Sequence, residues 1–178
     1  MLTYAADDEP EELTRVEEAP TKWLPNRFVV QTYDTCNAVL HAIQAQLPDL
    51  LIMDLCMRSR PQHDDMEGGP QHDDMEGSPQ QDDGRHRMGG VDTRTDPQEA
   101  SEGKGPAWDV IHFALNQGVK VIVLSKLPEN KRVTARLAGR GLVKWLVKDT
   151  ALRANQGQGL VHAVEDLLPQ DDRRRNRR

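Results

Sequence analysis

The sequence is poor in aromatic residues, in cysteine and in long apolar runs. Aromatic side chains make up 4% of the 178 residues, and the two cysteines, Cys36 and Cys56, lack the spacing of a zinc site. No apolar run approaches the roughly 20 residues that span a bilayer, and the chain does not open on a basic segment followed by an apolar one. We therefore expect a cytoplasmic protein without a disulfide framework, a zinc site or a membrane span.

Acidic residues outnumber basic ones. The chain has 29 Asp and Glu against 23 Lys and Arg, which gives a formal net charge of −6. An acidic body argues against nucleic acid binding by the main domain. The exception is the C-terminal tail 169–178, whose last six residues include five arginines. We expect a free, solvated basic end, and we expect nucleic acid contacts, if any, only through this Arg-rich tail.

A tandem repeat interrupts the chain. Residues 61–69 read PQHDDMEGG, residues 70–78 read PQHDDMEGS, and a decayed third copy begins at Pro79. The whole segment 58–106 is rich in Asp, Glu, Gly and Pro and has few apolar residues, so burial cannot offset the entropy lost on ordering it. We interpret 58–106 as a disordered, repeat-containing insertion that acts as a solvated spacer, despite the histidines among its aspartates.

The rest of the chain alternates between β-rich runs and stretches with apolar residues at helical spacing. The later β-rich runs are almost continuously apolar, as in strands that are buried on both faces. This alternation favours an α/β fold with a doubly wound, five-stranded parallel sheet, whose functional crevice lies at the carboxyl ends of the strands. The expected strands are 2–6, 27–32, 50–53, 119–124 and 142–147, and the expected helices are 11–18, 35–46, 107–117, 129–138 and 151–168.

Polar residues stand at the carboxyl ends of four of these strands. Asp7 and Asp8 follow the first expected strand and Asp54 follows the third. Ser125 ends the fourth strand and Lys148 follows the fifth. Because these strand ends meet at one edge of the sheet, the five side chains should converge. Carboxylates at close range raise one another's pKa, and a hard cation that takes oxygen ligands relieves this repulsion. The pattern therefore predicts a Mg²⁺ site.

In these positions and spacings the chain resembles the receiver domain of two-component response regulators. Asp8 and Asp54 are 46 residues apart, which is a receiver-like separation. The same holds for Ser125 and Lys148, which are 23 residues apart. Met57 stands three residues after Asp54, as it does in many family members. The resemblance implies a phosphorelay signalling protein.

The resemblance covers residues 1–168 apart from the insertion at 58–106, which falls after the strand that carries the phosphoacceptor. It implies a flavodoxin-like (βα)5 fold with strand order 2-1-3-4-5. Because the family's output domains are absent from the sequence, the chain looks like a stand-alone receiver with a basic tail at 169–178.

The roles of the site residues also follow from the resemblance. Asp54 would be the phosphoacceptor, and Lys148 would neutralise the charge of the phosphoryl group. Ser125 and Trp145 would be the switch residues. The metal ligands for Mg²⁺ would be Asp7, Asp8, Asp54 and the backbone carbonyl of Cys56.

Three residues depart from the family pattern. Arg58 stands where a proline often follows the methionine, and Lys126 stands where a small residue is common after the switch hydroxyl. Asp149 takes the place of the proline that usually follows the lysine. These departures concern phosphorylation and its lifetime more than the fold.

The implied function is a phosphorylation-dependent switch. Asp54 would accept a phosphoryl group from a sensor histidine kinase or a phosphotransfer protein, and the surface of helix 129–138 and strand 142–147 would then bind a downstream protein. The only chemistry implied is self-catalysed phosphoryl transfer to Asp54 and its hydrolysis. A phosphorylation-independent pseudo-receiver, acting as a constitutive interaction module, is the alternative. A haloacid dehalogenase-type phosphatase is disfavoured. Its Asp-x-Asp motif needs a second aspartate two residues after Asp54, and residue 56 of this chain is a cysteine.

Overall fold

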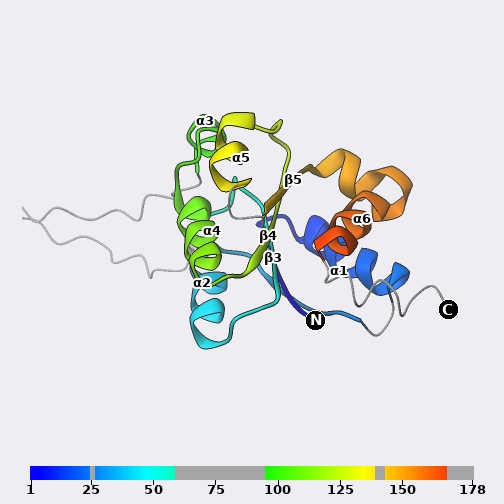
Figure 1. Cartoon of the computed structure of the whole chain (residues 1–178). Coiled ribbons are helices and arrows are strands. Elements are labelled where there is room, and N and C mark those ends of the chain that lie inside the picture. The colour runs from blue at the N-terminus through cyan, green and yellow to red at the C-terminus, as the bar shows by residue number, and fades with distance from the viewer. Residues whose placement is uncertain (25–26, 59–94, 139–142, 168–178) are drawn as a thin grey trace, which may run out of the picture.

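Five parallel strands form the central sheet of the fold in the computed structural model (Figure 1). The structure describes residues 1–24, 27–58, 95–138 and 143–167. The strand order is β2-β1-β3-β4-β5, and all four pairings are parallel. The predicted fold class and strand order are confirmed. The strands are β1 (Leu2–Ala6), β2 (Val29–Tyr33), β3 (Leu50–Met53), β4 (Lys120–Ser125) and β5 (Val143–Val147).

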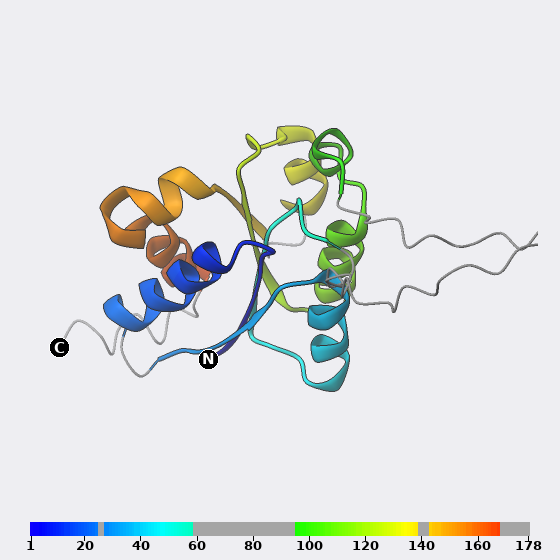
Figure 2. The ribbon, with the colours of Figure 1, turned by 180° about the vertical axis from the view of Figure 1, so that it is seen from behind.

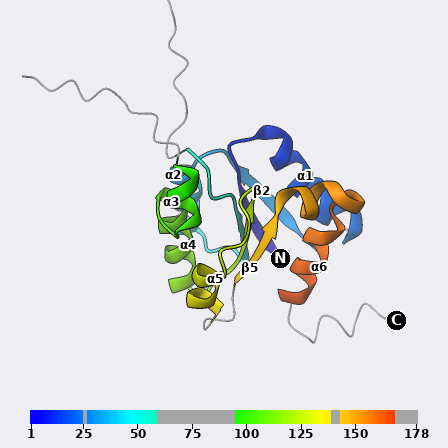
Figure 3. The same ribbon diagram turned by 90° about the horizontal axis from the view of Figure 1, so that it is seen from above.

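Helices cover both faces of this sheet. Helices α1 and α6 lie on one face, and α2, α4 and α5 lie on the other, so that the sheet is the middle of three layers (Figures 1, 2 and 3). None of the helices in the described ranges is both long and apolar enough to cross a membrane. The helices are α1 (Pro10–Trp23), α2 (Cys36–Ala45), α3 (Pro97–Ser101), α4 (Pro106–Asn116), α5 (Lys131–Ala138) and α6 (Gln158–Leu167).

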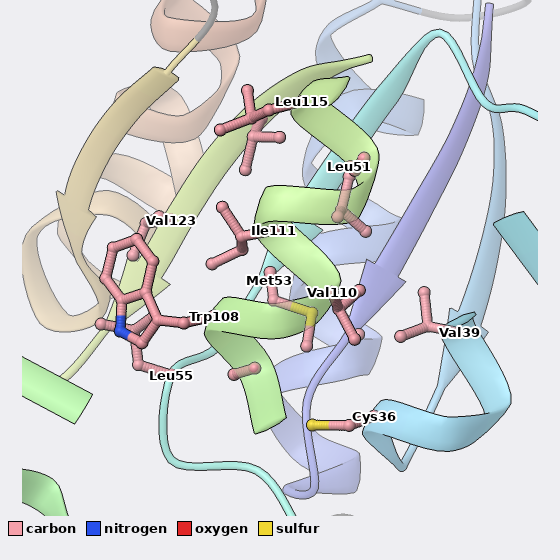
Figure 4. Close-up of a cluster of buried hydrophobic side chains, with 14 of the residues drawn as sticks. Cys36, Val39, Leu51, Met53, Leu55, Trp108, Val110, Ile111, Leu115 and Val123 are labelled. Atoms are coloured by element: carbon pink, nitrogen blue, oxygen red, sulfur yellow. The ribbon is translucent and has the colours of Figure 1, made fainter. Parts of the chain in front are cut away.

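The central strands are apolar on both faces because each face meets a helix layer. In β3, Leu51 and Met53 belong to the core cluster shared with α2, α4 and α5, whereas Leu50 and Ile52 belong to the cluster shared with α1 and α6. This alternation follows from the two-residue period of a strand. Trp108, from the first turn of α4, is the largest of the fully buried side chains in the described ranges, and it lies near Leu55 and Val123 in the first of these two clusters (Figure 4).

The last predicted helix, 151–168, is wrong over its first turns. The chain leaves β5 through a wide helical turn at Asp149–Arg153 and a 3₁₀ turn at Ala154–Gly157, and only then enters α6. Asn155 and Gln156 have left-handed φ values of 48° and 55°, which no regular helix contains. At Gly157, a Cβ atom would lie 2.5 Å from the Cβ of Ala19, so the close approach to α1 requires glycine.

The predicted disordered insertion is also wrong over residues 95–106, since α3 and the start of α4 lie there. Ala100 is fully buried, and its carbonyl accepts a hydrogen bond of 2.7 Å from Nε1 of Trp108. Asp96 caps α3 by accepting from the backbone N–H of Gln98. Contacts to distant residues also hold this polar segment: the Asn130 side-chain amide donates to the Ser101 carbonyl at 2.7 Å, and the Thr95 hydroxyl donates to the Met57 carbonyl. Residues 59–94, with the repeat, and the basic tail lie outside the described residues.

The residues on either side of 59–94 lie close together. The Thr95 hydroxyl donates to the Met57 carbonyl at 3.4 Å, and the Cys36 N–H donates to the Arg58 carbonyl at 3.0 Å. A short linker can therefore join them. We predict that replacing 59–94 by a six-residue Gly-Ser linker raises the free energy of unfolding by about 1 to 2 kcal/mol, because each doubling of loop length costs about 0.6 kcal/mol.

Urea denaturation of the wild-type chain and the shortened chain measures this difference. A free energy of unfolding that falls by more than about 1 kcal/mol on deletion would show that residues 59–94 pack against the domain, and the spacer interpretation would then be wrong.

Candidate functional site

Three aspartates meet at the carboxyl ends of β1 and β3. The backbone N–H of Asp54 donates to the Ala6 carbonyl at 2.9 Å, and that of Asp7 donates to the Tyr33 carbonyl at 3.0 Å, so the sheet hydrogen bonding extends to both residues. One carboxylate oxygen from each of Asp7, Asp8 and Asp54 lies within 4.8 Å of the others. The structure thus brings together the acidic residues that the sequence pattern predicted to converge.

Lys148 extends from the end of β5 into this acidic cluster. Its Nζ lies 2.7 Å from Oδ2 of Asp7 and 3.2 Å from Oδ2 of Asp54. The side chains of Lys148, Asp7 and Asp54 are 1%, 3% and 5% exposed. Charged groups so far from water are stable only when they are paired and hydrogen-bonded. The ammonium is therefore the main compensating charge for both carboxylates.

Burial also sets the pKa values of these groups. It raises the pKa of Asp7 from 3.8 to about 7, and the neighbouring Asp54 carboxylate adds to the rise. It raises the pKa of Asp54 too, although Lys148 opposes the shift. Burial alone would lower the pKa of Lys148, but the carboxylates of Asp54 and Asp7 outweigh it, and the pKa is raised. Lys148 therefore stays charged, and additional positive charge nearby would stabilise the ionised form of the two carboxylates.

The donor set suits a hard divalent cation. Three aspartate oxygens within 4.8 Å of one another are the ligand type that Mg²⁺ and Ca²⁺ take. The chemistry of the residues present therefore fits a Mg²⁺ ion. Cys56, the fourth expected ligand through its carbonyl, lines the same cavity as Asp54.

The two expected switch residues are connected through the backbone of Leu127. Ser125 is fully buried at the end of β4, and its Oγ accepts a hydrogen bond of 3.2 Å from the Leu127 N–H. Trp145, on β5, donates from Nε1 to the Leu127 carbonyl at 3.3 Å. The Trp145 ring also lies 6.0 Å from the ring of Trp108. Sequence patterns could not indicate a role for Leu127, since these two contacts use only its backbone.

A cavity of about 340 Å³ opens above Asp54. Across it, Nζ of Lys126 lies 2.5 Å from Oε1 of Glu9. Two of its lining residues, Thr95 and Pro97, belong to the segment 58–106 that we predicted to be disordered from its composition. No local sequence pattern could have placed them at this site. The lining residues are Glu9, Asp54, Cys56, Thr95, Pro97, Lys126 and Leu127.

Two of the three residues that depart from the receiver pattern lie at the site. Lys126 borders the cavity, and Nε of Arg58 lies 3.7 Å from Oδ2 of Asp8. The third, Asp149, points outward, where its carboxylate pairs with Arg153 at 3.3 Å and is 69% exposed. The peptide bond between Lys148 and Asp149 is trans, as are the other described peptide bonds.

The structure is similar to solved response regulators. RcsB from Salmonella enterica serovar Typhimurium, bound to promoter rprA in the presence of phosphomimetic BeF3⁻, matches with a TM-score of 0.56 and 14% identity, covering 94% of this chain and 98% of the RcsB chain. The Vibrio cholerae chemotaxis protein CheY4 matches with a TM-score of 0.52 and 13% identity, over 94% and 98% of the two chains. No protein-family model and no curated sequence matches the chain.

The fold is therefore that of a response regulator receiver domain, as the resemblance of the sequence implies. At 13% to 14% identity the likeness concerns the fold.

Proposed function

We propose that the chain is a phosphorylation-dependent signalling switch in which Asp54 accepts a phosphoryl group. The main support is the contact between Asp54 and Lys148, at 3.2 Å, beside a cavity that reaches the Asp54 side chain. A buried carboxylate next to a fixed ammonium can take up a group that carries negative charge, because the ammonium compensates the added charge.

In the proposed reaction, a carboxylate oxygen of Asp54 attacks the phosphorus of a phosphohistidine, or of a small phosphodonor such as acetyl phosphate. The bond from phosphorus to the donor breaks, the donor leaves with the electron pair, and an acyl phosphate forms on Asp54. Lys148 neutralises charge on the phosphoryl oxygens. Asp7, Asp8, Asp54 and the Cys56 carbonyl would hold Mg²⁺, which supplies further positive charge for the transferred group when it is bound.

The contacts at Leu127 suggest how the signal would spread. If the Ser125 hydroxyl turns to donate to the phosphoryl group, the Leu127 N–H loses its acceptor. The loop then shifts, and the Trp145 indole, which donates to the Leu127 carbonyl, is free to follow it. This changes the surface of α5 and β5, which would bind a downstream protein in the cytoplasm. The expected phosphate source is a sensor histidine kinase or a phosphotransfer protein.

Mass spectrometry after incubation with Mg²⁺ and acetyl phosphate tests the proposal. The wild-type chain should gain the mass of one phosphoryl group, hydroxylamine should remove it, and Asp54→Asn should gain none. Asp109→Asn, which changes an exposed aspartate on α4, is the matched control and should behave as wild type. If wild type takes up no phosphate, or Asp54→Asn takes up as much, the constitutive pseudo-receiver replaces this proposal.

A further inference from the structure

We propose that Arg58 is a built-in competitor of the divalent cation: its guanidinium pairs with Asp8 in the metal-free site and must leave this position when Mg²⁺ binds. The inference rests on the proposed function only in that both use the same acidic site. It assigns a role to a residue that the family resemblance marked only as a departure.

The first support is the way the structure holds Arg58 at the site. Arg58 lies four residues after Asp54, beyond the end of β3, and its carbonyl accepts a hydrogen bond of 3.0 Å from the Cys36 N–H at the start of α2. The backbone is thus fixed between β3 and α2. From there the side chain reaches Asp8, with 3.7 Å between Nε and Oδ2.

The second support is the burial of this ion pair. The Asp8 side chain is 7% exposed and the Arg58 side chain is 30% exposed. Water screens a charge interaction much less in such a place than at an open surface, so the guanidinium both stabilises the Asp8 carboxylate and repels a nearby cation.

The third support is the charge balance of the cluster. Lys148 contacts Asp7 and Asp54, and Arg58 contacts Asp8, so each of the three carboxylates has a cationic neighbour without a metal. Lys148 is buried and held by two carboxylates. Arg58 is partly exposed at the rim, so its side chain can turn toward solvent. Of the two cations, Arg58 is therefore the one that a divalent ion displaces.

Calorimetric titration with Mg²⁺ measures the competition. Arg58→Gln, which keeps a polar group at about the position of Nε but removes the charge, should bind Mg²⁺ about tenfold more tightly than wild type. Arg58→Lys should stay within about twofold of wild type, because it keeps the charge. The matched control is Arg136→Gln, an exposed arginine on α5, which should leave the affinity unchanged.

Thermal melting gives a second measurement. Without metal, Arg58→Gln should melt at a lower temperature than wild type, because the buried Asp8 carboxylate then loses the guanidinium beside it. In saturating Mg²⁺ the two melting temperatures should converge, since the ion takes over the role of the guanidinium. Arg58→Met replaces Arg58→Gln if circular dichroism shows that the latter does not fold.

The inference is overturned if the uncharged variant binds Mg²⁺ as wild type does or more weakly, or if neither protein binds the ion. Phosphoryl uptake is recorded separately on the same proteins. Tighter Mg²⁺ binding by Arg58→Gln with no phosphoryl uptake by any variant would support the competition and refute the proposed function, so the two failures can be told apart.

Discussion

Replacing Lys148 with alanine is expected to lower the free energy of unfolding of the metal-free protein by about 3 to 5 kcal/mol, the range for removing one partner of a buried ion pair. The substitution leaves the Asp7 and Asp54 carboxylates buried without the ammonium that lies 2.7 Å and 3.2 Å from them. The loss should shrink as the pH falls toward about 7, because without the ammonium the pKa of Asp7 lies above that value and the carboxyl takes up a proton in that range.

Urea denaturation in EDTA measures this loss. Adding Asp54→Asn to Lys148→Ala should restore part of the stability, because it removes one of the two uncompensated charges. Lys104→Ala is the control, since Lys104 pairs with Glu102 at the surface, where water screens the pair, and its stability should stay close to that of wild type. A loss below about 1 kcal/mol for Lys148→Ala would mean that the two carboxylates do not depend on this ammonium.

The positions that sequence patterns predicted well are those set by local periodicity and by chain order along a parallel sheet. Asp54 is an example. It follows four consecutive apolar residues, Leu50 to Met53, and such a run is typical of a strand that is buried on both faces of a parallel sheet. Once the strands are in place, the carboxyl ends of β1, β3 and β5 bring Asp7, Asp54 and Lys148 together without further information.

The features that the sequence did not predict depend on contacts between distant segments. The Arg58 contact with Asp8 and the Lys126 contact with Glu9 each join residues from different loops, and side-chain chemistry alone does not select these partners. Segment 95–106 has the composition of a spacer, yet Ala100 and its carbonyl are buried against Trp108. Composition averages over a segment and so misses a few anchoring contacts.

Trp108 provides one of these contacts, and its replacement carries the second large expected effect. It is 1% exposed in the first turn of α4, its indole N–H donates to the Ala100 carbonyl at 2.7 Å, and its ring lies 6.0 Å from that of Trp145. Trp108→Ala should lower the free energy of unfolding by about 3 to 5 kcal/mol, because it leaves a large cavity between α4 and the sheet.

Urea denaturation should show a smaller loss, about 1 to 2 kcal/mol, for Trp108→Phe, which keeps most of the ring volume but removes the indole donor to the Ala100 carbonyl. That carbonyl keeps its hydrogen bond of 3.2 Å from the Gly103 N–H. Arg136→Gln, which changes an exposed arginine on α5, is the control and should stay within about 0.5 kcal/mol of wild type. Because Trp108 also supports Trp145, both substitutions at Trp108 should change the fluorescence of Trp145 even where the domain remains folded. An alanine variant as stable as wild type would mean that α3 and the core of α4 do not depend on this side chain.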